Sequence, residues 1–78
     1  MDEYDEFNAI CSLETLHDSM DAMSIHSSVM AVEAHRMKVA GFCPTLYEVM
    51  RNLEKLVVET ETVLLTEIDN FYKERKNG

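Results

Sequence analysis

The sequence contains few helix-breaking residues and no long apolar run. Its 78 residues include two glycines, one proline and no tryptophan, while 46% are hydrophobic. This composition excludes collagen-like and disordered chains. Aliphatic runs such as Val29–Val32 and Leu56–Val58 fall far short of the ~18 residues that a membrane-spanning helix needs. We therefore expect a single helical domain over residues 1–78, with no membrane association.

Basic residues are also scarce. Seven Lys and Arg stand against 15 Asp and Glu, which gives a formal net charge of −8. Proteins that bind a phosphate backbone need Lys and Arg to replace counterions, so we expect no direct nucleic-acid binding. No Lys or Arg occurs before Arg36. The N-terminal half therefore predicts an acidic surface made of Asp2, Glu3, Asp5, Glu6, Glu14, Asp18 and Asp21.

Targeting signals and disulfide motifs are lacking as well. The first residues, MDEYDEF, are acidic, whereas a secretory signal begins with basic residues. The two cysteines, Cys11 and Cys43, form no CxxC or Cys/His pattern. Free thiols are typical of reducing compartments, so we expect a cytoplasmic protein.

A heptad pattern predicts a first helix over residues 8–40, preceded by a frayed acidic segment at 1–7. The pattern alternates gaps of three and four residues and is apolar at all but one position. Its members are Leu13, Leu16, Met20, Met23, Ser27, Met30, Ala34 and Met37. Gly41 is suited to the left-handed conformation that ends a helix in a Schellman motif. The segment Ser24–Ser28 favours helix weakly, so a break there is an alternative.

A second stripe of the same period predicts a helix over residues 45–75, after a loop at 41–44 and before a tail at 76–78. Thr45 and Glu48 have the spacing of a capping box that would open this helix. The stripe consists of Leu46, Met50, Leu53, Val57, Thr60, Leu64, Ile68 and Phe71. Together the two stripes predict an all-α fold, an antiparallel helical hairpin of two long helices.

The polar members of the two stripes suggest a register. In an antiparallel hairpin, residues at one level have numbers that add up to a constant. Pairing Ser27 with Thr60 gives 87, and the same value pairs Met30 with Val57. We therefore predict a shared polar layer of Ser27 and Thr60.

The first helix carries a second apolar stripe, roughly 160° around its axis from the first. The hairpin cannot cover this stripe with its own second helix, and two helices alone have little core. We expect a partner-binding surface there, covered by a second copy in a homodimeric four-helix bundle or by another protein. Its residues are Ala22, Ile25, Val29, Val32 and Val39.

No phosphate-binding glycine loop or nucleophile elbow is present, so we expect neither an enzyme nor a cofactor. The favoured function is a non-enzymatic protein-binding module, such as a small acidic adaptor, chaperone or inhibitor. One alternative is an acidic nucleic-acid mimic, for example a phage- or mobile-element-type inhibitor of a nucleic-acid-binding protein. A second alternative is a helical bundle that binds two metal ions, because Glu14 and His17 have the ExxH spacing of such proteins. These two residues flank the inward-facing stripe rather than belonging to it, so we predict no metal ligands.

In outline the pattern resembles the hairpin dimers of Rop-type plasmid regulators, small secretion-system co-chaperones and acidic phage-encoded inhibitors. The resemblance is one of shape, and it implies no residue roles in this chain.

Overall fold

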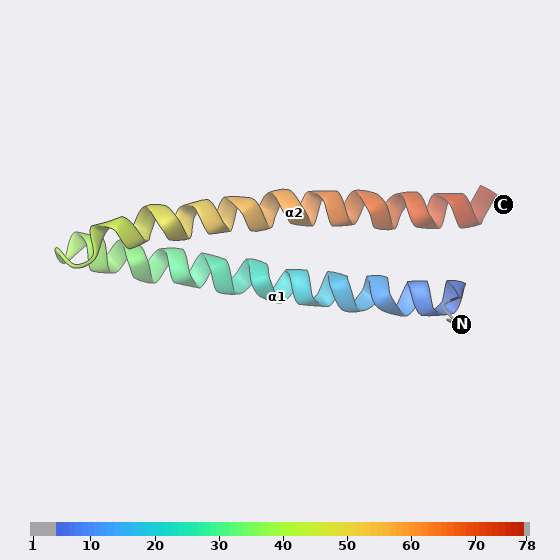
Figure 1. Cartoon of the computed structure of the whole chain (residues 1–78), viewed down its shortest axis with the longest axis horizontal. Helices are drawn as coiled ribbons and strands as arrows, with labels where there is room; N and C mark the ends of the chain where they lie inside the picture. The colour runs from blue at the N-terminus through green and yellow to red at the C-terminus, as the bar shows by residue number, and fades with distance from the viewer. Residues whose placement is uncertain (1–4, 78) are drawn as a thin grey trace.

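A computed structural model of the protein describes residues 5–77. Its two α-helices are α1, Glu6–Val39, and α2, Pro44–Asn77, and each has 34 residues. They lie antiparallel and side by side, with the connecting loop at one end and both chain ends at the other (Figure 1). The predicted all-α helical hairpin is confirmed.

The start of α1 is set by Asp5. Its Oδ1 accepts a hydrogen bond from the Asn8 backbone N–H at 3.0 Å, which satisfies one of the free donors of the first turn. Helix therefore begins at Glu6 rather than at residue 8, and residues 5–7 of the segment expected to fray are ordered by this cap. The rest of that segment lies outside the described residues.

The helix α1 is continuous through Ser24–Ser28, so the alternative with a break there is wrong. The Ser27 hydroxyl donates to the Ser24 carbonyl at 3.0 Å, and Ser27 is only 3% exposed. Serine weakens helices when its hydroxyl competes for backbone groups in non-helical conformations. Here the hydroxyl is satisfied within the helix, and burial of the serine against α2 outweighs its low intrinsic preference.

The end of α1 is a Schellman motif, as predicted. The N–H of Phe42 donates to the Met37 carbonyl at 2.8 Å, and the N–H of Gly41 donates to the Lys38 carbonyl at 3.0 Å. Gly41 has φ +89°, a conformation that glycine adopts without steric cost. The loop thus turns the chain within a few residues.

The second helix begins one residue earlier than predicted. Pro44 is its first residue, where the missing N–H costs nothing and the fixed φ is already helical. Thr45 therefore lies inside the first turn and does not cap it, so the expected capping box is absent. Cys43 precedes the helix with φ +42°. The loop accordingly spans residues 40–43 rather than 41–44, and α2 continues to Asn77.

The predicted register is wrong. Ser28 contacts Glu54 and His35 contacts Tyr47, two pairs whose numbers each add up to 82 rather than 87. The short loop is the reason. Because α1 ends at residue 39 and α2 begins at residue 44, residues that face each other across the hairpin have numbers that add up to about 83. Ser27 is consequently buried near the level of Val57, while Thr60 is exposed and its hydroxyl bonds the Leu56 carbonyl.

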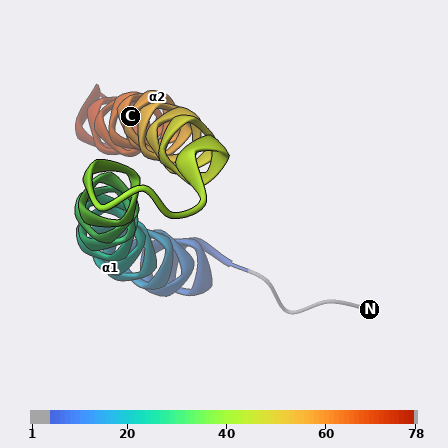
Figure 2. The same ribbon diagram turned by 90° about the vertical axis from the view of Figure 1, so that its left-hand side faces the viewer.

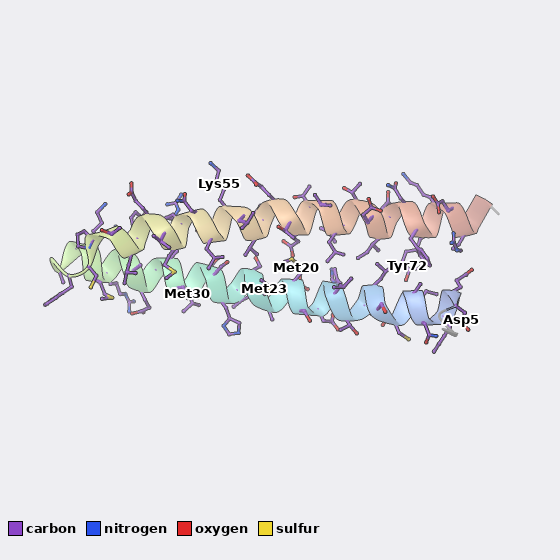
Figure 3. The ribbon with its side chains drawn as sticks, in the orientation of Figure 1. Asp5, Met20, Met23, Met30, Lys55 and Tyr72 are labelled. Atoms are coloured by element: carbon purple, nitrogen blue, oxygen red, sulfur yellow. The ribbon has the colours of Figure 1, made fainter. Side chains whose placement is uncertain are left out.

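On α1, the part of the seam nearest the loop is made largely of small residues. Among the side chains of residues 5–75, the buried ones are Met20, Ser27, Ala31, Ala34 and Val57. Small residues near the loop let the two backbones approach closely there, and the ribbons diverge toward the chain ends in both views (Figures 1 and 2). Figure 3 shows Met20 between the helices and Lys55 pointing away from α1.

The heptad stripe of α1 is therefore only half buried. Met20, Ser27 and Ala34 face α2, but the bulky side chains between them, Met23, Met30 and Met37, are 49%, 41% and 37% exposed. The helix is rotated so that Ala31 enters the seam in their place. Smaller side chains permit closer packing of the two helices, which the methionines would prevent.

Gly41→Ala should destabilise the hairpin through backbone strain alone. A Cβ at this position would meet no atom within 4 Å, so only the positive φ opposes it, at about 1–2 kcal/mol. Gly41→Asn should lose less, because Asn tolerates the left-handed region. Urea unfolding followed by circular dichroism measures both; equal stability of the Ala variant and the wild type would contradict this account of the loop.

Ala34→Leu should destabilise the hairpin by about 1–3 kcal/mol, because the added methylenes overpack a seam where Ala34 is buried. Ala22→Leu is the matched control, since Ala22 is exposed on the same helix. The free energy of unfolding from urea titrations compares the two. A similar free energy for both variants would show that the small-residue seam is not tightly packed.

Candidate interaction surfaces

The first candidate surface is the outer stripe of α1, made of Ala22, Ile25, Val29, Val32 and Val39. Ile25 and Val29 each lie two residues before a buried seam residue, which places them on the far side of the helix from α2. Val32 lies at the edge of the stripe, where it borders a hollow shared with Tyr47 and Arg51 of α2. All five residues are exposed, with Ile25 at 65%, Val29 at 55% and Val39 at 75%. The chain's own helices leave this stripe uncovered, and its role in binding stays a prediction.

The second candidate surface is an apolar side face to which both helices contribute. Met30 lies three residues after buried Ser27, and Leu53 lies four residues before buried Val57, so both flank the seam on one side. Leu56 and its heptad equivalents extend the face around α2. We define the side face as Met23, Met30, Met37, Leu46, Val49, Leu53, Leu56 and Val63, which are 36–62% exposed.

The side face was not predicted as a surface, although most of its residues belong to the two stripes. The sequence pattern assigns Met30 and Leu53 to the hairpin core because it does not show how far each helix is rotated about its axis. The available signal was a pair of small residues one heptad apart, Ser24 and Ala31. This pair competes with the methionines for the seam.

The opposite side of the hairpin is polar. The rings of His35 and Tyr47 lie 5.1 Å apart, and an Arg51 guanidinium nitrogen donates to the Tyr47 hydroxyl at 2.9 Å. Arg51 also pairs with Glu54 at 3.7 Å, and the Ser28 hydroxyl donates to the Glu54 carboxylate at 2.8 Å. These largely exposed contacts contribute little stability. This side of the hairpin therefore presents polar groups to solvent.

The predicted acidic surface is divided in the structure. Asp5 caps α1, and Glu6 pairs with Arg75 of α2 at 3.2 Å, which links the two chain ends. The others that the structure describes, Glu14, Asp18 and Asp21, follow one edge of α1. Asp2 and Glu3 lie outside the described residues.

His17 lies beside two of the carboxylates on this edge of α1. Its Nδ1 lies 3.8 Å from both Asp18 and Asp21. Glu14, His17 and Asp18 also line an open hollow of about 390 Å³ between the helices, where Leu65 and Tyr72 form part of the wall from α2. In the described part of the chain, no three His, Cys, Asp or Glu side chains are placed to hold a metal ion. Cys11 and Cys43 are both free and exposed.

Neither helix, over the residues that the structure describes, is long and apolar enough to cross a bilayer. Comparison of the chain with protein-family models, curated proteins and solved structures gives no match.

Proposed function

We propose that this chain is a non-enzymatic protein-binding module that docks another protein on the outer stripe of α1. The exposure of Ile25, Val29 and Val32 in one row carries the proposal. Their spacing is i, i+4 and i+7, the anchor pattern that a helix presents to an apolar groove. Contiguous apolar patches exposed on small proteins mark interaction sites more often than chance.

The composition supports an adaptor, chaperone or inhibitor that works in the cytoplasm. A net charge of −8 keeps a protein with so much exposed apolar surface soluble. The free, exposed thiols of Cys11 and Cys43 suit a reducing compartment. The acidic residues beside the outer stripe, Asp18 and Asp21, would favour a partner with basic residues around its groove.

One observation favours the acidic mimic as a second candidate. Glu14, Asp18 and Asp21 are spaced four and three residues apart and share an exposed edge of α1. A row of carboxylates along a rod can occupy a site that normally receives a phosphate backbone. Binding of this kind depends on charge and weakens steeply with ionic strength, unlike apolar docking.

Val29→Asp should abolish partner capture while leaving the hairpin helical. An unpaired carboxylate at the centre of an apolar interface should cost roughly 3 kcal/mol or more of association. Val58→Asp is the matched control, because Val58 is exposed to a similar degree but belongs to α2. The measurement is a pull-down from lysate of the native host with mass spectrometry, with circular dichroism of each variant.

A specific partner is one retained by the wild type and by Val58→Asp but lost with Val29→Asp. Retention by Val29→Asp would reject the outer stripe as the docking site. A partner that all three proteins bind, and that is released as the salt concentration rises, would favour the acidic mimic instead.

A further inference from the structure

The hairpin is a single layer of helices. Its extents are 57, 26 and 17 Å, and a helix with its side chains is about 10–12 Å wide. The shortest dimension thus holds one helix and the middle dimension holds two, as the view from the loop end shows (Figure 2). Stable domains instead pack at least two layers around one core. The radius of gyration, 17.6 Å, likewise exceeds the about 11.5 Å of a compact chain of this length.

The side face continues the buried seam. Met30 and Leu53 occupy the same heptads as buried Ser27 and Val57, displaced to one side. In a four-helix bundle, each helix turns an arc of apolar residues toward both neighbours, so it needs a wider stripe than a two-helix contact does. The stripes of α1 and α2 have this width, and the hairpin itself buries only one edge of each.

We infer that a second copy of this chain packs on the side face and completes a four-helix bundle. One copy exposes 6149 Å², whereas a compact protein of its mass exposes about 4,900 Å². The excess of roughly 1,200 Å² is more than the about 800 Å² that each partner buries in an interface of standard size. The hairpin as a whole therefore has spare surface of the size that one partner of a dimer buries.

Charge also favours this face over the others for self-association. A two-fold dimer buries the same patch of both copies, so every charge in the patch is buried twice and needs a partner across the interface. None of the eight residues that define the side face is ionisable, and His26 and Glu33 border it on α1. The polar side contains Arg51 and Glu54, and the outer stripe is interrupted by Arg36, paired with Glu33 at 3.1 Å. Burying such charges would carry a desolvation penalty.

This assignment goes beyond the proposed function, because it separates two surfaces. The second copy covers the side face, where both helices take part, and the outer stripe stays on the outside of the bundle. The dimer would then present two outer stripes for docking of a different protein.

Two substitutions two residues apart on α2 test the inference. Leu56, 58% exposed, belongs to the side face, while Val58, 51% exposed, lies on the other side of the helix. Sedimentation equilibrium at about 100 µM, roughly a hundredfold above a ~1 µM dissociation constant, should give about 18 kDa for the wild type, twice the chain mass of 9.0 kDa. Leu56→Glu should give a single-chain mass, and Val58→Glu should remain dimeric.

Val29→Asp should also remain dimeric, which separates this inference from the proposed docking site on α1. A single-chain mass for the wild type would overturn the inference, as would equal masses for Leu56→Glu and Val58→Glu. A monomeric Val29→Asp beside a dimeric Leu56→Glu would place self-association on the outer stripe instead.

Methionine oxidation tests the same face in the unchanged protein, in case Leu56→Glu does not fold. Met30 is 41% exposed and Met20 is 8% exposed in one copy, so an isolated hairpin should oxidise several times faster at Met30. In the dimer both residues are covered, and dilute peroxide at about 100 µM protein should oxidise them at similar rates. Peptide mass spectrometry reads the two rates, and a much faster reaction at Met30 would overturn the inference.

Discussion

The close contact of α1 with α2 through small residues determines how the rest of the molecule is arranged. Ser27, Ala31 and Ala34 are buried against the second helix, and the loop at residues 40–43 sets the level at which the helices meet. A seam of small side chains brings backbones together but buries little apolar area per residue. The larger apolar residues are thereby displaced to the flanks, where the chain alone cannot cover them.

Because of this displacement, the sides of the hairpin differ in polarity. The side face is apolar and built from both helices, the outer stripe is apolar and belongs to α1, and the side around Tyr47 carries exposed ion pairs and hydrogen bonds. A single layer of two helices has too small a core to account for its own stability. In the proposed dimer, burial of the flanks would supply the apolar area that the seam lacks, and association would then contribute to the folding free energy.

The side face and the outer stripe share no residues, so different partners can cover them at the same time. Self-association through the side face would complete a core, and the outer stripe would stay exposed on a rigid helix, where anchors such as Val29 are presented with little loss of conformational entropy. The acidic edge at Asp18 and Asp21 lies on the same helix. It would modulate the rate and selectivity of encounter more than the strength of apolar docking.

The sequence by itself determined the elements of this protein. Heptad spacing, Gly41 and Pro44 locate two helices and a short loop, and the predicted boundaries differ from those of the structure by one or two residues. Rotation and register were decided only by tertiary packing. Whether Ala31 or Met30 enters the seam depends on how closely the two backbones approach. The position of Thr60 along the hairpin depends on the residue at which the loop ends and α2 begins. Periodicity specifies an apolar arc, while steric fit between two helices selects the edge that is buried.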